Sequence, residues 1–246
     1  MSHIRFLDSL TSKLFRNELT DFNKMHPKFF INGLLVLLFI GSFPFKGLSQ
    51  FDLSIKAGMN MGDIKVRSEN LLVDEQYAPL RLWHVGISGT TEFSEKFGGQ
   101  IGLLVNQKGG QSPLDLSMPN PLEAYWQYKI TYLTLPMLLQ YKAGPLSFEA
   151  GPEVSCLIGL KTLRNDVKVS NDLSFLGKYP YEIAASIGFK FTVERFFTEL
   201  KWTRGLNTMG QVVFYDMDGV KLGHYDHFSH TIQVSFGFYF YKRNKD

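Results

Sequence analysis

The sequence predicts an all-β fold, an eight-stranded antiparallel up-and-down transmembrane β-barrel. Apolar and polar residues alternate in eight separate runs from Phe51 onward, and a period of two indicates a β-strand. The connections between the runs alternate between short and long. The polar face is rich in Gly, Ser, Ala and Thr, with fewer Lys and Glu than water-facing strands usually carry. Tight turns at one end and large loops at the other are typical of bacterial outer-membrane barrels.

Each run places its apolar residues on one face. In the runs 52–61, 83–93, 97–106 and 132–141 these residues are Leu53, Ile55, Ala57, Met59 and Met61; Trp83, Val85, Ile87 and Phe93; Phe97, Ile101, Leu103 and Val105; and Leu133, Leu135, Met137, Leu139 and Tyr141. In the runs 146–156, 181–190, 196–203 and 231–240 they are Leu146, Phe148, Ala150, Val154 and Cys156; Tyr181, Ile183, Ala185, Ile187 and Phe189; Phe196, Leu200 and Trp202; and Ile232, Val234, Phe236, Phe238 and Phe240.

The connections set how neighbouring runs pair. Short connections are expected at 94–96, 142–145 and 192–195, and long ones at 63–80, 109–126, 161–180 and 207–228. The short hairpins are expected to pair Phe93 with Phe97 and Thr91 with Gly99, Tyr141 with Leu146 and Leu139 with Phe148, and Phe191 with Phe196 and Ile187 with Leu200. Apolar sides then meet apolar sides in every hairpin, as a shared face requires.

Two orientations of the barrel are compatible with alternation. A soluble lipocalin-like barrel would turn its apolar face inward, and a membrane barrel would turn it toward lipid. Small polar-face residues suit the crowded interior of a narrow eight-stranded barrel, which favours the membrane orientation. Two aromatic belts favour it as well. They comprise Phe51, Phe93, Phe97, Tyr141, Phe191, Phe196 and Phe240 near the short turns, and Trp83, Trp126 and Tyr181 near the long loops.

Charge and cysteine content exclude several classes of function. The formal net charge is +3, but residues 1–50 hold six Lys or Arg and three Asp or Glu, which leaves 20 of each sign in the remainder. No basic stripe of the kind that binds nucleic acid is present. Cys156 is the single cysteine, so neither an internal disulfide nor a thiolate metal cluster can form.

The front of the chain has the layout of a secretory signal peptide at 25–49. His26 and Lys28 precede an apolar run at 29–45, and small residues at Gly47 and Ser49 place cleavage before Gln50. An uncleaved anchor is the alternative, although the run is short for a membrane helix and is interrupted by Gly and Pro. Residues 1–24 are interpreted as a mis-assigned N-terminal extension, or otherwise as a cytoplasmic tail. The barrel domain is expected at 50–246.

Five segments of this chain resemble the PorT-like outer-membrane β-barrel domain family of Gram-negative bacteria. They are Ile55-Lys56-Ala57-Gly58-Met59-Asn60, Val105-Asn106-Gln107-Lys108-Gly109, Tyr132-Leu133-Thr134-Leu135-Pro136-Met137-Leu138-Leu139, Ala150-Gly151-Pro152-Glu153-Val154 and Trp202-Thr203-Arg204-Gly205-Leu206-Asn207. The resemblance implies an eight-stranded barrel in the outer membrane and no single activity. The family's namesake is linked to a protein-secretion and gliding system. The chain departs from many barrels in continuing past its last aromatic residues to Asp246.

Two sets of residues suggest chemistry. His84, Ser88 and Glu92 share the interior face of one run and invite a hydrolase interpretation. Residues four apart on a strand are about 13 Å apart, too far for a proton relay. In the last long loop, the potential metal ligands are His224, Asp226, His227 and His230, with Asp216 and Asp218 upstream. The alternative is a polar surface loop, and the start of a calcium-like loop at 216–219 is interpreted as a turn.

Eight charged residues are expected inside the barrel. They are Lys56, Glu92, Glu149, Glu153, Glu182, Lys190, Glu199 and Lys201. They could line an ion path or form a plug of paired charges, and the plug is favoured because eight strands leave room only for side chains. Lys190 and Glu199 are expected to lie close together inside the barrel, diagonally across neighbouring strands and within reach of each other.

The sequence therefore predicts a non-enzymatic outer-membrane barrel that presents four surface loops for envelope or surface interaction. The loops carry Tyr77, Tyr125, Tyr215 and Tyr225. One alternative is an accessory component of an envelope secretion or gliding system, and another is a lumenal lipid-modifying enzyme. The expected partners are outer-membrane lipid and envelope proteins, with no nucleic acid, and the expected state is a monomer. No catalytic residue, cofactor or metal site is assigned.

Overall fold

The computed structural model describes residues 51–69, 77–112, 125–168, 180–215 and 221–242. The secondary structure in these ranges consists of β-strands. The described residues contain no helix that is long and apolar enough to cross a membrane. These strands belong to one compact unit, Ser49–Asp246. The expected extension at 1–24 and signal peptide at 25–49 lie outside the described residues.

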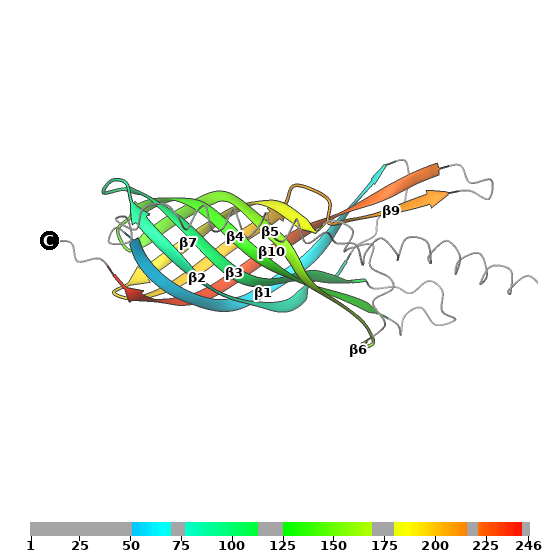
Figure 1. Ribbon diagram of the computed structural model, residues 1–246, viewed down its shortest axis with the longest axis horizontal. Helices are drawn as coiled ribbons and strands as arrows, with labels where there is room; N and C mark the ends of the chain where they lie inside the picture. The colour runs from blue at the N-terminus through cyan, green and yellow to red at the C-terminus, as the bar shows by residue number, and fades with distance from the viewer. Residues whose placement is uncertain (1–50, 70–76, 113–124, 169–179, 216–220, 243–246) are drawn as a thin grey trace, which may run out of the picture. The chain divides into compact units, whose positions relative to one another are not determined.

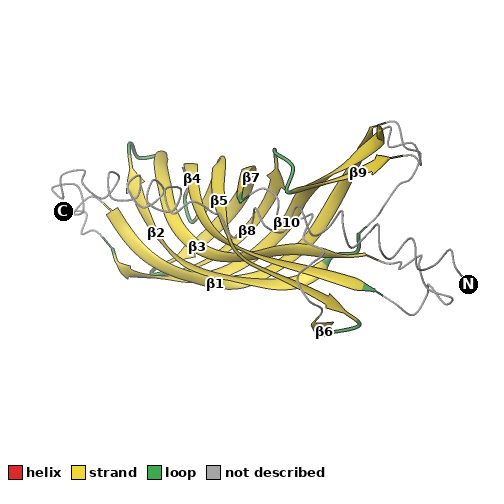
Figure 2. Ribbon diagram, turned by 45° about the vertical axis from the view of Figure 1, so that its right-hand side comes forward, coloured by secondary structure: helices red, strands yellow, loops and turns green. Residues whose placement is uncertain are grey.

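Eight long strands form a closed antiparallel ring (Figures 1 and 2). In order around the ring they are β1 (Phe51–Glu69), β2 (Leu80–Glu92), β3 (Phe97–Ser112), β4 (Trp126–Ala143), β5 (Leu146–Arg164), β7 (Tyr181–Val193), β8 (Phe196–Gly205) and β10 (Lys221–Tyr241). Pairing of β1 with β10 closes the ring, from Leu53 opposite Tyr241 to Glu69 opposite His224. The predicted eight-stranded up-and-down barrel is confirmed. Because the ring is closed, no strand edge is left with unpaired backbone groups facing lipid, which cannot form hydrogen bonds with them.

The register fixes how steeply the strands are tilted. The row of paired residues that starts at Phe51 passes once around the ring and returns to β1 at Met61, ten residues further along. A stagger of this size over eight strands tilts them by roughly 40° from the barrel axis, so each residue advances about 2.5 Å along that axis. The ten-residue step from Trp83 to Phe93 then spans about 25 Å, the height of an outer-membrane apolar band.

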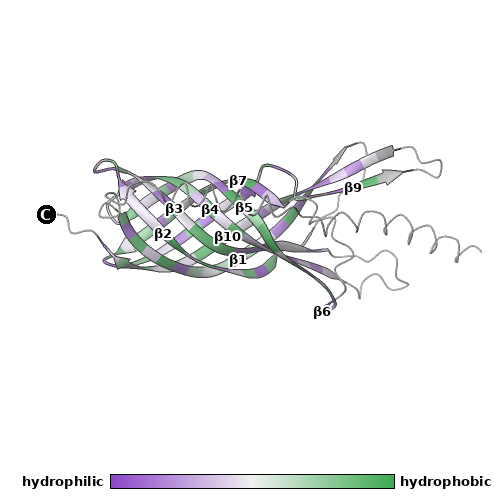
Figure 3. Ribbon diagram, viewed as in Figure 1, coloured by the Kyte–Doolittle hydropathy of each residue, from purple (hydrophilic) through white to green (hydrophobic). Residues whose placement is uncertain are grey.

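The two faces of the strands differ as the alternation predicts. On β7, Glu182, Ser186 and Lys190 are buried, whereas Ile183 and Ile187 are 43% and 56% exposed. Figure 3 shows the same alternation of hydrophobic and hydrophilic residues along the strands. An inward polar face and an exposed apolar face are the reverse of a soluble barrel. The lipocalin-like alternative is therefore wrong.

The hairpin turns are tighter than expected at two of the three short connections. Tyr141 pairs with Phe148 and Val193 pairs with Phe196, so each expected pairing is displaced by two residues. Positive φ angles at Gly144 (64°) and Glu194 (53°) allow two-residue turns there. A shift of two keeps every side chain on its predicted face. In the first hairpin, Thr91 pairs with Gly99 as expected.

The long connections are shorter than expected, because the strands continue past the apolar band. β1 extends to Glu69, β3 to Ser112 and β5 to Arg164, which turns into the short strand β6 (Val167–Lys168). The expected loop 207–228 contains β9 (Gly210–Tyr215), which pairs with the first part of β10. Figure 1 shows β9 and its partner reaching beyond the ring at the same end as β6. Both faces of these extensions carry polar residues, so alternation of apolar residues does not reveal them.

Candidate functional site

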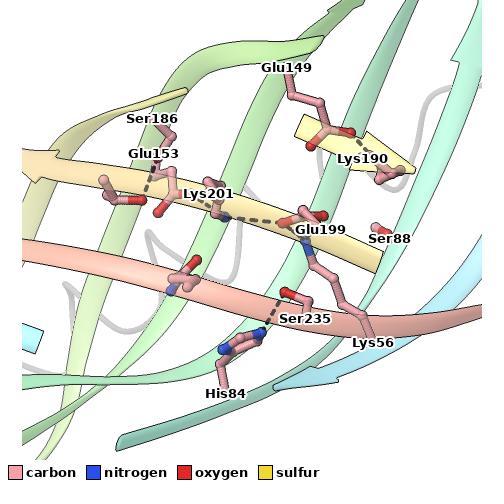
Figure 4. Close-up of polar contacts among 12 residues, drawn as sticks. Lys56, His84, Ser88, Glu149, Glu153, Ser186, Lys190, Glu199, Lys201 and Ser235 are labelled. Atoms are coloured by element: carbon pink, nitrogen blue, oxygen red, sulfur yellow. Dashed lines mark hydrogen bonds and ion pairs between the residues drawn. The ribbon is translucent and has the colours of Figure 1, made fainter. Parts of the chain in front are cut away.

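Four buried ion pairs occupy the barrel interior. Figure 4 shows Lys56, Lys190 and Lys201 with their glutamate partners. The nitrogen–oxygen distances are 2.8 Å for Lys56–Glu199, 2.7 Å for Lys108–Glu182, 2.6 Å for Lys190–Glu149 and 2.6 Å for Lys201–Glu153. Every one of these side chains is at most 2% exposed. Burying a charge is tolerable when an opposite charge and hydrogen bonds compensate it. Here each of the four buried lysines has one buried glutamate that compensates its charge.

Three of these pairs connect strands that are not neighbours in the ring. Lys56 on β1 reaches past β10 to Glu199 on β8, and Lys201 on β8 reaches past β7 to Glu153 on β5. Lys108 on β3 reaches Glu182 on β7, with two strands between them. The pairs therefore brace the interior across the ring. This arrangement supports a plug of paired charges more than an open ion path.

Lys190 and Glu199 lie close together inside the barrel, as expected, but each forms its ion pair with another residue. The two residues are direct register partners on β7 and β8, because the tighter turn moves them from a diagonal to an opposite position. Lys190 instead binds Glu149 and donates to Gln100, while Glu199 accepts from Lys56 through both carboxylate oxygens at 2.8 Å. Lys and Glu side chains are long enough to reach residues on strands other than their hairpin partner, so the hairpin register alone does not determine the ion pairs.

One expected interior charge lies at the end of the network, and one member was missed. Glu92 pairs with Lys142 at 2.7 Å near the short turns, where the two side chains are 18% and 22% exposed. Lys108 is fully buried, although the sequence interpretation did not place it inside. It follows Asn106 by two residues on the same strand face. Continuing the alternation by one more step would have identified it.

The potential hydrolase residues have separate partners. His84 Nδ1 lies 2.6 Å from Asn60 Oδ1, and its Nε2 lies 2.8 Å from Ser235 Oγ. Ser88 Oγ lies 2.8 Å from Ser54 Oγ, and Glu92 binds Lys142. His84, Ser88 and Glu92 therefore do not form a relay, as their spacing on one strand requires.

An apolar cluster fills the interior toward the long-loop end. Its buried members are Ile64, Tyr77, Tyr128, Ile130, Tyr132 and Met209. Tyr128 and Ile130 lie on the inward face of β4, further toward the loops than Tyr132, whose ring faces Lys108 Nζ at 5.6 Å. The cluster therefore borders the charged network on its loop side. Side chains of both kinds occupy the lumen.

The potential metal ligands of the last connection do not converge. His224 Nε2 lies 3.4 Å from Asp226 Oδ2 on the outer face of β10, while His227 on the other face lies 3.2 Å from the Gly210 carbonyl oxygen. His230 belongs to the strand, where its Nε2 accepts from Trp202 Nε1 at 2.6 Å. Within the described ranges, no group of three His, Cys, Asp or Glu residues could hold a metal. Asp216, Asp218 and the calcium-like segment 216–219 lie outside the described residues.

The loop end is held by its own polar contacts. Tyr125 Oη donates to Asp166 Oδ2 at 2.6 Å, and Tyr125 N donates to Asn165 Oδ1 at 3.0 Å. These bonds connect the start of β4 to the β5–β6 turn. The hydrogen bond to the Asp166 carboxylate raises the pKa of Tyr125.

The fold, the lipid-facing apolar band and the filled lumen define an outer-membrane β-barrel protein. The family model described as outer membrane protein beta-barrel domain matches residues 42–210. The chain belongs to this family, and the family places it at the outer membrane. No curated protein matches the chain.

Several solved structures are similar to this chain at low sequence identity. Neisserial surface protein A is 7% identical with a TM-score of 0.41, over 77% of this chain and 97% of that chain. The attachment invasion locus protein Ail of Yersinia pestis is 11% identical with a TM-score of 0.34, over 76% and 97%. The outer membrane protease OmpT from Escherichia coli is 9% identical with a TM-score of 0.31, over 76% and 96%.

Proposed function

We propose that the protein is a non-enzymatic outer-membrane barrel whose loop end recognises molecules of the cell surface or envelope. The barrel anchors the loops, and its interior serves stability. The four ion pairs and the apolar cluster support this division, because they fill the space that a transported solute or an enzyme substrate would need. The proposal assigns no catalytic residue, cofactor or metal.

The observation that carries the proposal is the paired sheet beyond the apolar band. The β1–β10 ladder continues from Asp63 opposite His230 to Glu69 opposite His224, and β9 adds a third strand along Gly210 to Tyr215. Strand pairing beyond the lipid is unnecessary for membrane insertion. It holds the loop-end residues in fixed positions, and a rigid scaffold under variable connections is a common basis for recognition.

The resemblance to the PorT-like family favours a second function, as an accessory component of an envelope secretion or gliding system. Its contacts would involve the periplasmic, short-turn end as well as the loops. Both proposals share export by a signal peptide with cleavage next to Gln50, a monomeric barrel, and outer-membrane lipid and envelope proteins as partners. Lumenal lipid modification is the remaining alternative, and the separate partners of His84, Ser88 and Glu92 disfavour it.

Site-specific photo-crosslinking in intact cells tests these functions. A crosslinking residue at Val167, which is 68% exposed in the β5–β6 hairpin, samples the loop end, and one at the exposed Lys96 samples the short turns. Surface recognition predicts protein or glycan adducts at Val167 and lipid or none at Lys96. Adducts with secretion components at Lys96 would support the accessory function. Absence of adducts at Val167 under conditions that crosslink Lys96 would contradict loop-end recognition.

A further inference from the structure

Two lysines face each other on the outer surface of the barrel. Lys129 on β4 and Lys161 on β5 are direct register partners. Their chain neighbours Tyr128, Ile130 and Thr162 are buried in the interior, so both lysines project outward. None of the ion pairs formed by the described residues includes either lysine. Like charges directly opposite on a sheet destabilise the pairing unless an anion compensates them.

The pair lies at the level where lipid headgroups begin. Leu133 opposite Cys156 belongs to the lipid-facing surface of the same two strands. Lys129 is four residues closer to the loops, which is about 10 Å along the barrel axis at the tilt of this ring. The ammonium groups therefore lie above the apolar band, on the side of the long loops. That side faces the outer leaflet in bacterial barrels.

The surface below the lysines has donors and open space. Thr131 pairs with Gly159 directly below Lys129 and Lys161. Gln107 on β3 approaches this position, with its amide Nε2 3.5 Å from Thr131 Oγ1. Gly159 has no side chain, and an added Cβ would have Thr131 Cβ as its nearest neighbour at 3.7 Å. A headgroup could therefore approach the backbone between the two strands.

The two rims of the barrel differ in charge. Near the long loops, Lys161, Lys65, Arg67, Arg81 and Arg204 are exposed and Lys129 is partly exposed. Lys65 pairs with Asp63 at 2.6 Å, and Asp166 in the β5–β6 turn is also exposed. At the short turns, acidic and basic residues are mixed, as in Glu95, Lys96, Glu194 and Arg195. Among the described residues, exposed basic side chains therefore outnumber exposed acidic ones on the outer-leaflet side, where they complement an anionic headgroup layer.

We propose that Lys129 and Lys161 bind the phosphate group of a phosphorylated outer-leaflet lipid, with Thr131 and Gln107 as additional donors. A phosphate accepts several hydrogen bonds and carries the charge that offsets both ammonium groups. The acyl chains would continue down the apolar surface that begins at Leu133 and Cys156. The inference depends on the membrane orientation of the barrel and is independent of any protein partner.

Native mass spectrometry of the full-length protein, refolded in detergent, tests the site. The probes are phosphatidic acid, diacylglycerol with the same chains, and inorganic phosphate. The test variant is Lys129→Gln with Lys161→Gln. The matched control is Lys96→Gln with Arg195→Gln, which removes the same charge at the short turns. Heat-modified gel mobility verifies that each variant is folded, and the two single lysine variants repeat the test with smaller perturbations.

We expect the double lysine variant to bind phosphatidic acid about 30-fold more weakly, since one basic residue near a headgroup contributes a factor of about five. Each single variant should lose about fivefold, the control should match the unmodified protein, and diacylglycerol should not discriminate among them. Equal binding of phosphatidic acid by both double variants would overturn the site. Competition by inorganic phosphate at the same concentration as the lipid would overturn the lipid as its occupant. Neither result depends on the crosslinks at Val167, so the two proposals fail separately.

Discussion

Glu199 offers a direct test of the charge network, because two lysines near it are related to it in different ways. Lys56 Nζ donates to both oxygens of its carboxylate at 2.8 Å. Lys190 is its register partner but binds Glu149 at 2.6 Å. We therefore expect strong energetic coupling between Glu199 and Lys56, and weak coupling between Glu199 and Lys190.

The expected loss of unfolding free energy depends on how deeply the remaining charge is buried and on which charged residues still lie near it. Glu199→Gln keeps the volume but leaves Lys56 buried without its carboxylate, and loss of one partner of a buried pair costs about 3–5 kcal/mol in the free energy of unfolding. Lys56→Met leaves Glu199 with Lys201 at 3.9 Å, so we expect a cost near the lower limit, about 3 kcal/mol. The double variant should cost less than the sum by about 2–3 kcal/mol. The same cycle with Lys190→Met should give a coupling under about 1 kcal/mol.

Urea unfolding in lipid vesicles, followed by tryptophan fluorescence, measures these free energies, and heat-modified gel mobility reports the folded fraction. Lys190→Met is a matched control, because it too leaves a buried glutamate, Glu149, without its lysine. Equal coupling of Glu199 to both lysines would refute the pairing described here. A cost below about 1 kcal/mol for Glu199→Gln would mean that the lumen is hydrated. Stable planar-bilayer currents that change with these charges would refute the plug.

Three further predictions test the orientation, the packing and the processing of the chain. Leu135→Arg on the lipid face should cost about 2–4 kcal/mol of unfolding free energy, whereas Val167→Arg in the exposed hairpin should change it by less than about 0.5 kcal/mol. Gly58→Ala places a Cβ 2.0 Å from the Val234 carbonyl oxygen and should cost about 1–3 kcal/mol, while Gly159→Ala should be nearly neutral in the same urea assay. N-terminal sequencing of protein from the envelope should begin at or next to Gln50. Retention of 29–45 would contradict that processing.

Alternation was sufficient to predict the membrane orientation and the face of almost every strand residue. A period of two depends on the chain alone, so Ile187 on the lipid side and Glu182 on the lumen side could be assigned without knowing any neighbour. The predicted pairing differed from the observed pairing by two residues in two hairpins for the same reason. Alternation determines which face a side chain lies on, but it does not determine the length of the turn. The positive φ of Glu194 is a property of the local backbone, and the pattern of polar and apolar side chains does not predict it.

Partners inside the lumen could not be predicted in this way. Alternation places Lys201 and Glu153 inside, but β7 separates their strands, and which charges meet depends on tilt and stagger around the whole ring. The strand extensions were missed because β1 and β10 carry polar residues on both faces beyond the apolar band. For example, Lys65 on the outer face of β1 is exposed, whereas His227 and Ser229 on the inner face of β10 are buried. Hydrogen bonding maintains the ladder there without a lipid-facing stripe.

The paired charges also explain how this chain avoids a register error. If the lumen were lined by apolar residues, both faces of each strand would be compatible with lipid, and nothing would favour one face over the other. A slip of one residue turns every side chain of a strand to the opposite face. On β8 that slip would turn Glu199 and Lys201 toward lipid, where a charge near the midplane costs up to about 2–4 kcal/mol. Because each ring strand except β2, β4 and β10 carries at least one member of the four pairs, the charged lumen specifies which face points inward for most of the barrel.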